Sequence, residues 1–246
     1  MLGGMERHAE LGSTNDRARE LARAGAEHGY LVWADRQTAG RGRKGAEWWC
    51  APGRGLAFSV VVRPRWERAR WGWLSLAAGL GVAEALEGFG FRPAIKWPND
   101  LLWKGRKIAG ILLEVNGETD GPASATIGIG VNLDLESDLQ QQIGQPYASL
   151  RDAGVVVDRN RLAADLLEAS VSMCRRFTDA GLTPFLDTWR RYDVLQGRSV
   201  RLVGPNHELK GNSLGLADDG GLRLQIGESI STYYSGELSL RAGKGP

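Results

Sequence analysis

The sequence is poor in cysteine and histidine, and this scarcity excludes several kinds of site. Its 246 residues include two cysteines, Cys50 and Cys174, and three histidines. None of them stands at the short spacings that structural metal sites or redox pairs require. Because no disulfide framework is indicated, the expected setting of the chain is reduced and cytoplasmic.

Long apolar runs and a strong net charge are missing as well. The N-terminus, MLGGMERHAEL, lacks the apolar core of a signal peptide. The most apolar helical stretch, residues 71–86, contains Glu84 and falls short of the roughly 20 residues that span a bilayer. A net charge of +2 argues against general nucleic-acid binding. We therefore expect a soluble protein that engages neither a membrane nor a specific nucleic acid.

The sequence does contain a regular succession of apolar segments and breaks. Ser13-Thr14-Asn15 precede a helical pattern, and a Ser or Thr in that place caps a helix. Short apolar or alternating runs predict strands at residues 30–34, 56–62, 94–97, 101–103, 107–115 and 124–133. Longer runs predict helices from the STN segment to about residue 26, at residues 71–86, and, with apolar positions on one face, at residues 159–178 and 184–192. The expected fold class is α+β, with a mixed β-sheet flanked by helices.

The pattern changes near the C-terminus. Residues 134–158 are polar and acidic, which is typical of a surface loop. After Gly197, short apolar runs are divided by Gly, Asn and Asp, which predicts strands at residues 199–203, 209–216, 222–226 and 230–240. We therefore expect a main domain over residues 1–195 and a small all-β domain over residues 196–246.

A basic, glycine-rich segment is the first candidate site. Residues 37–55 show no periodicity and include GRGRKG at positions 40–45. Glycines let backbone N–H groups turn toward an anion, and arginines add charged donors. The segment matches neither the Walker loop nor GxGxxG. A solvated loop or an RNA-binding segment is the alternative, but Trp48-Trp49 favour a nucleotide, on whose base a tryptophan could stack.

The sequence KWPND, at positions 96–100, is the second candidate. Proline ends strand pairing, so Asn99 and Asp100 would stand exposed at a turn. An aspartate there could hold Mg²⁺ beside phosphates. A turn whose Asn and Asp satisfy only local backbone groups is the alternative.

Two strands carry the remaining candidates. In KIAGILLE, residues 107–114, Lys107 stands at the mouth of an apolar strand, and Gly110 would let a ligand lie against the backbone. In GIGVNL, residues 128–133, alternate glycines are costly unless something approaches closely. Asn132 could hydrogen-bond a base or a ribose. An exposed strand-end lysine and a tightly packed strand are the alternatives.

The order of these motifs resembles the biotin–protein ligase family over nearly the full chain. STN, Gln37 with GRGRKG, KWPND, KIAGIL with Glu114, and GIGVN follow one another as in that family. The resemblance implies a catalytic domain followed by a Src-homology-3-like β-barrel. It also implies activation of biotin by ATP with Mg²⁺ to biotinyl-5'-AMP, then transfer to a lysine of a biotin carboxyl carrier protein.

The resemblance assigns roles to individual residues. The implied biotin-binding residues are Ser13, Thr14, Asn15, Gln37, Gly40, Arg41, Gly42, Arg43, Lys107 and Gly110. The implied ATP-binding residues are Arg41, Arg43, Trp48, Asn99, Asp100, Lys107 and Asn132. Lys107, Arg43 and Arg41 are the implied catalytic residues, and Asp100 is the implied magnesium ligand. Where the family often carries a further basic residue, Ala46-Glu47 stand here.

Some family members carry an N-terminal helix-turn-helix that represses transcription. This chain begins a dozen residues before STN, so the monofunctional type without operator binding is expected. A monomer and a homodimer both stay open.

Three rival interpretations are kept. A lipoate– or octanoate–protein ligase shares the fold, but its loop carries a histidine, and none stands near residues 40–45 here. A nucleic-acid-binding module would show steep salt dependence, yet it leaves Gln37, KWPND and KIAGIL unexplained. A pseudoenzyme would bind biotin without transferring it, although no key basic position is missing.

Overall fold

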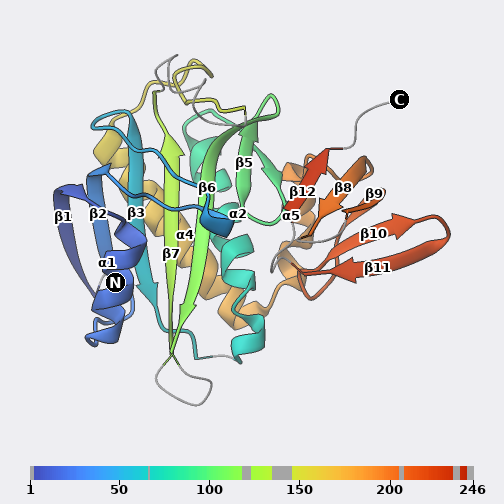
Figure 1. The fold of residues 1–246 in the computed structure, drawn as a ribbon, viewed down its shortest axis with the longest axis horizontal. Helices are drawn as coiled ribbons and strands as arrows, with labels where there is room; N and C mark the ends of the chain where they lie inside the picture. The colour runs from blue at the N-terminus through green and yellow to red at the C-terminus, as the bar shows by residue number, and fades with distance from the viewer. Residues whose placement is uncertain are drawn as a thin grey trace.

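The computed structural model describes residues 3–65, 67–117, 123–134, 146–204, 208–234 and 239–242, and these residues form two sheets (Figure 1). The larger sheet has seven strands in the order β1-β2-β3-β7-β6-β5-β4. These strands are β1 (Gly4–Leu11), β2 (Tyr30–Gln37), β3 (Gly55–Val62), β4 (Ala94–Lys96), β5 (Asp100–Trp103), β6 (Arg106–Asn116) and β7 (Ser124–Asn132). Strands β1 and β2 run parallel and the other neighbours antiparallel, so the sheet is mixed as predicted.

Helices cover both faces of this sheet. They are α1 (Thr14–Arg23), α2 (Trp73–Gly88), α4 (Arg159–Ala180) and α5 (Leu186–Tyr192), with short 3-10 turns at Arg43–Gly45, Arg68–Arg70 and Thr183–Phe185. Successive side chains of a strand point to opposite faces. Leu31 and Trp33 therefore join the large core under α2 and α4, while Val32 packs with Ala18 and Ala22 of α1. Figure 1 shows α1 in front of the sheet and α4 behind it.

The smaller sheet is antiparallel throughout, in the order β11-β10-β9-β8-β12. Its strands are β8 (Ser199–Val203), β9 (Glu208–Leu216), β10 (Leu222–Ile226), β11 (Ser229–Tyr233) and β12 (Ser239–Ala242). It joins the main sheet through the Trp73 and Trp97 indoles, whose Nε1 atoms donate to Asp219 O at 2.6 Å and Gly220 O at 3.3 Å. Leu202 and Leu224 belong to the same core as the main sheet. The division at residue 195 stays a prediction, since apolar packing crosses it.

The structure differs from the sequence-based expectation at the ends of the chain. Strand β1 was not predicted, because its sequence, GMERHAEL, is mostly polar and none of its residues is buried. It is an edge strand, and only its pairing with β2 reveals it. The strand predicted over residues 230–240 is divided into β11 and β12. Residues 135–145 of the loop predicted over 134–158 lie outside the described residues. In the part of the chain that the structure describes, no helix is both long enough and apolar enough to cross a membrane.

Candidate active site

The floor of the candidate site is made of the smallest residues of the central strands. Phe58 of β3 and Ile129 of β7 point into the large core, so Ala57, Gly128 and Gly130 point to the opposite face. These three residues line a pocket on that face, and Gly110 of β6 joins them. The alternate glycines of the sequence therefore leave space on the one face of the sheet that α2 and α4 do not fill.

Two of these glycines are in close contact with named side chains. A Cβ atom on Gly128 would stand 2.2 Å from Asn15 Oδ1, and one on Gly130 would stand 2.3 Å from the Trp48 ring. On Gly110, it would lie 3.0 Å from Cε of Lys107. The predicted close approach to these strands is therefore confirmed, although the approaching groups here belong to the protein itself.

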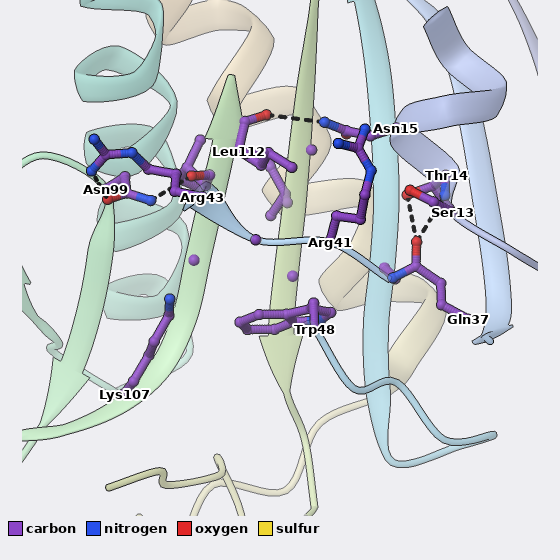
Figure 2. Close-up of a pocket in the computed structure, with 17 residues that line it drawn as sticks. Ser13, Thr14, Asn15, Gln37, Arg41, Arg43, Trp48, Asn99, Lys107 and Leu112 are labelled. Carbon is purple, nitrogen blue, oxygen red and sulfur yellow. Dashed lines mark hydrogen bonds between the residues drawn. The ribbon is translucent and has the colours of Figure 1, made fainter. Parts of the chain in front are cut away.

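One end of the pocket is neutral and polar, and the N-terminus of α1 supplies it. Ser13 caps the helix by accepting from Asp16 N at 3.4 Å. Gln37 Oε1 accepts from Thr14 N at 2.8 Å and from Thr14 Oγ1 at 3.0 Å, as Figure 2 shows. Ser59, fully buried in β3, donates to Asn15 Oδ1 at 2.6 Å, and its Oγ lies 2.8 Å from Thr14 Oγ1.

The other end of the pocket is basic. Arg43 Nη1 donates to Asn99 Oδ1 at 3.2 Å, while Asn99 Nδ2 donates to Ile111 O at 2.7 Å. Burial lowers the pKa of Arg43. Lys107 Nζ lies 5.5 Å from the centre of the Trp48 ring, at a distance typical of a cation–π contact. In Figure 2, Trp48 lies between Lys107 and the polar end.

Asp100 stands behind this basic end, between two lysines. Its carboxylate oxygens lie 2.6 Å from Lys107 Nζ and 2.8 Å from Lys96 Nζ. Burial alone would raise the pKa of Asp100, but the two lysines outweigh burial and hold this pKa below its ordinary value. Asp100 is thus a carboxylate that fixes the position of Lys107.

The Asp100→Asn variant is expected to lower the free energy of unfolding by about 2–4 kcal/mol at neutral pH, because it leaves two lysines without their counter-ion. The native pKa lies below the unfolded one, so the contribution of the carboxylate is present above the ordinary value of 3.8 and is lost as pH falls through the lowered value. Urea denaturation of wild type and Asp100→Asn should show that the difference between their free energies of unfolding disappears only when the pH falls through the lowered pKa of Asp100. Asp187→Asn, on an exposed aspartate of α5, is the matched control, and an equal loss there would contradict the prediction.

The basic loop folds back on itself above the pocket. Gly42 N donates to Ala46 O at 2.6 Å, and Trp48 N donates to Gly40 O at 2.9 Å. A Cβ on Gly40 would stand 2.2 Å from Trp48 O, so this turn requires glycine. Lys44 adopts a left-handed φ of 57° at the tip. The loop is therefore an ordered hairpin-like turn that carries Arg43 and Trp48 over the sheet.

Comparison with known proteins identifies this arrangement. The model of the biotin/lipoate A/B protein ligase family matches residues 10–132, and the model of the biotin protein ligase C-terminal domain matches residues 196–241. The chain belongs to the biotin protein ligase family. It is 36% identical to the bifunctional ligase/repressor BirA of Salmonella typhimurium over 86% of this chain and 66% of that protein. The chain thus spans slightly less than two thirds of that relative.

Other members of the family match over most of their length. The biotin–[acetyl-CoA-carboxylase] ligase of Mycobacterium tuberculosis is 33% identical, over 94% of this chain and 86% of that protein. A solved structure of the biotin protein ligase from Aquifex aeolicus, in complex with biotin and ATP, superimposes with a TM-score of 0.85 at 29% identity. It covers 98% of this chain and 99% of that chain. The predicted fold class is therefore confirmed.

Most residues that the family resemblance singled out meet in the one pocket. Nine of the predicted biotin-binding residues line it: Ser13, Thr14, Asn15, Gln37, Arg41, Gly42, Arg43, Lys107 and Gly110. Trp48 and Asn99 line it as well. Gly40 instead packs against Trp48. Their ligand contacts stay predictions, since the geometry shows only where the side chains lie.

Three predicted residues have their functional groups occupied by other parts of the protein. Asn132 Nδ2 donates to Lys107 O at 3.3 Å and to Ala148 O at 3.0 Å, so its amide holds backbone beside the pocket. The Arg41 guanidinium is in ion pairs with Asp16 and Glu114. Asp100 has a lysine on each carboxylate oxygen, an arrangement that does not fit the predicted magnesium ligand. The part of the chain that the structure describes also contains no cluster of three or more His, Cys, Asp or Glu residues suited to a metal.

Sequence reasoning gave no role in the site to Ser59, Asp16 or Glu114, although Glu114 was quoted with the KIAGIL motif. Ser59 had a signal, because it is the one polar residue in the otherwise apolar run LAFSVVV. Asp16 looked like an ordinary first-turn acid of a helix. Glu114 follows the motif KIAGILL directly, but only the sheet brings it to Asn15 and Arg41.

Proposed function

We propose that this protein is a biotin–protein ligase. It would use ATP to convert biotin to biotinyl-5'-AMP and then transfer the biotinyl group to a lysine of a biotin carboxyl carrier protein. The observation that carries this proposal is the polarity of the pocket. A neutral hydrogen-bonding end at Thr14 and Gln37 faces a basic end at Arg43 and Lys107 across a floor of glycines. Biotin has the same division, with a neutral ureido ring at one end and a carboxylate at the other.

The neutral end suits a ureido group. A buried donor or acceptor without a partner costs about 1–3 kcal/mol, so such a ring must be matched group by group. In this structure the Thr14 hydroxyl and backbone N–H both donate to the amide oxygen of Gln37. We expect Gln37 and Thr14 to form hydrogen bonds with the ureido ring in place of some of their bonds with each other.

The basic end suits the activation step. An oxygen of the biotin carboxylate attacks the α-phosphorus of ATP, a mixed anhydride forms, and pyrophosphate leaves. The carboxylate and the phosphate are both anions and repel each other. Arg43 and Lys107 supply positive charge where the negative charge builds up. The phosphates would compete with Asp100 for Lys107. Trp48, which lines the pocket beside Lys107, would stack on the adenine.

The loop suits the second step. The lysine amine of the carrier protein attacks the acyl carbon, and AMP leaves with the electron pair of the broken acyl–phosphate bond. Until that amine arrives, water must be kept from the anhydride. The ordered turn over residues 40–48 would cover the intermediate and exclude water.

The proposal extends to the cofactor and the setting. Mg²⁺ is proposed as a counter-ion that enters with the ATP phosphates, not as an ion resident on Asp100, so no step here depends on it. The proposed partner is a biotin carboxyl carrier domain of a carboxylase. A cytoplasmic location is proposed from the soluble enzymes of the family, and a monomer or a homodimer agrees with the proposal equally.

A biotin substrate has more support than lipoate. The family model that matches residues 10–132 includes both kinds of ligase. The C-terminal model is that of biotin protein ligases, and the relatives with 33–36% identity are named for biotin or as BirA.

Pyrophosphate release tests the proposal directly. Purified protein with Mg²⁺ and ATP should release pyrophosphate on addition of biotin, and should then label a carrier domain on its target lysine. Lipoate and octanoate serve as matched substrates. Release with lipoate but not with biotin would transfer the assignment to the rival ligase, and release with none of them would overturn it.

The Arg43→Gly variant is expected to release biotinyl-adenylate about tenfold faster than wild type, because the loop loses a charged contact at the basic end. Freed adenylate acylates amines without enzyme, so labelling should become less selective. Dissociation of preformed adenylate in the absence of carrier measures the effect. Retention as tight as in wild type would show that Arg43 has another role.

A further inference from the structure

Four charged side chains from three separate segments meet beside the pocket. Arg41 of the loop donates from Nε to Asp16 Oδ2 at 3.2 Å and from Nη2 to Asp16 Oδ1 at 2.8 Å. The same Nη2 lies 2.9 Å from both carboxylate oxygens of Glu114 on β6. Arg19 of α1 adds contacts of 2.6 Å to Asp16 and 4.0 Å to Glu114. The loop is thereby tied both to α1 and to the sheet.

The charges in this cluster cancel. Arg41 and Arg19 contribute two positive charges, and Asp16 and Glu114 contribute two negative charges. Burial would lower the pKa of Arg41, but Glu114 and Asp16 outweigh it and raise the pKa. A guanidinium engaged by two carboxylates has little net charge to offer a phosphate. Arg43 Nη1 donates to the amide oxygen of Asn99, and burial lowers the pKa of Arg43 although the nearby Asp100 acts to raise it.

The cluster is also connected to the neutral end of the pocket. Glu114 Oε2 accepts from Asn15 Nδ2 at 2.8 Å, and Asn15 Oδ1 accepts from Ser59 at 2.6 Å. Arg41 is only one residue beyond Gly40, whose turn sets the path of the loop toward Trp48. A side chain held at this point therefore determines where the rest of the loop lies above the pocket.

We propose that Arg41 is a positioning residue: its guanidinium, clamped by Asp16 and Glu114, anchors the start of the loop over the pocket and gives no charge to the reacting phosphate. The proposal rests on the proposed function, because the covered ligand is taken to be biotinyl-adenylate. It makes Asp16 and Glu114 determinants of how tightly that intermediate is held. It also separates Arg41 from Arg43, which the sequence treats alike.

Two substitutions separate anchoring from charge. Glu114→Gln removes one carboxylate of the clamp and keeps the shape of the side chain. Arg41→Lys keeps the charge but loses the planar fork that reaches both carboxylates at once. If Arg41 anchors the loop, both variants should behave alike. If its charge served the phosphate, Arg41→Lys would keep most of the activity and Glu114→Gln would gain some.

We expect both variants to release biotinyl-adenylate about five- to tenfold faster and to raise KM for biotin by a similar factor. Their single-turnover rates of adenylate formation at saturating biotin and ATP should stay within about twofold of wild type, because the reacting groups are intact. Glu10→Gln is the matched control. Glu10 pairs with Arg36 at 2.7 Å on the exposed surface, away from the pocket residues.

A readout independent of activity completes the test. Hydrogen–deuterium exchange of the backbone amides of residues 40–48 should be faster in Glu114→Gln and in Arg41→Lys than in wild type or Glu10→Gln. Unchanged exchange and unchanged adenylate release would overturn the anchoring role, and so would an Arg41→Lys enzyme that works like wild type. Wild-type protein that forms no adenylate would overturn the proposed function instead, while the exchange result would still decide whether the clamp holds the loop.

Discussion

Replacement of Lys107 by alanine is expected to slow pyrophosphate release by about two to three orders of magnitude. Lys107 Nζ is the ammonium group at the basic end of the pocket, 2.6 Å from Asp100. Its removal leaves the charge that develops on the α-phosphate without that partner, and Asp100 keeps Lys96. The fold should therefore survive while the first half-reaction fails. Single-turnover formation of biotinyl-adenylate measures the loss.

Lys210→Ala is the control for this experiment, because Lys210 is exposed on β9 in the smaller sheet. Its rate should equal that of wild type. Lys107→Arg should be more active than Lys107→Ala but less active than wild type, because the guanidinium is larger than the ammonium group that it replaces beside Trp48 and Asp100. An alanine variant whose rate stayed within about threefold of wild type would contradict a direct role in charge stabilisation.

Replacement of Gly128 by alanine is expected to weaken biotin binding by about 100-fold. The new Cβ would stand 2.2 Å from Asn15 Oδ1, and Asn15 cannot easily give way because Ser59 and Glu114 hold its amide. A shift of Asn15 would displace the neutral end of the pocket. Overpacking of this kind also costs about 1–3 kcal/mol of stability. Isothermal titration with biotin and urea denaturation measure the two effects.

Gly88→Ala at the end of α2 is the matched control. Nothing lies within 4 Å of a Cβ built there, so stability should be unchanged or slightly higher, since alanine favours helix more than glycine does. Asn15→Ala in the Gly128→Ala background should recover part of the lost stability but not the binding, because the overlap disappears together with a ligand group. Normal biotin affinity in Gly128→Ala would show that the floor does not limit the site.

The two faces of the large sheet have different roles: one packs in the core, and the other lines the pocket and carries α1. One face carries Phe58, Ile129 and their neighbours and packs against α2 and α4. The other face has small residues under the pocket and larger ones under α1. The same strands thus stabilise the fold through one set of side chains and leave room for a ligand through the next.

Local sequence patterns predicted most of the elements and the residues that gather in the pocket. Ser13 signalled the start of α1, and strands β5 and β6, which the turn at Lys104-Gly105 joins, were both predicted. These features depend on neighbours a few residues away, so the sequence reveals them. The alternate glycines of β7 likewise indicated a close approach, although not what approaches.

Contacts between segments that are distant in the sequence could not be predicted from local patterns. The sequence predicted Asn99 and Asp100 exposed at a turn, and this was wrong: Asn99 is buried, and Asp100 begins strand β5 with its carboxylate between Lys96 and Lys107. Strand β1 became recognisable only beside β2.

What the sequence alone determined was the type of protein: the order of its motifs, its strand and helix periods, and a basic, glycine-rich loop. Only the tertiary structure decided which charges face a ligand and which neutralise each other. Arg41 and Arg43 are equivalent in the printed sequence, two residues apart in one loop. They differ because the side chain of Glu114 on β6, 73 residues from Arg41, reaches the guanidinium of Arg41 and not that of Arg43. Charge interactions act through space, and the sheet order sets the distances over which they act.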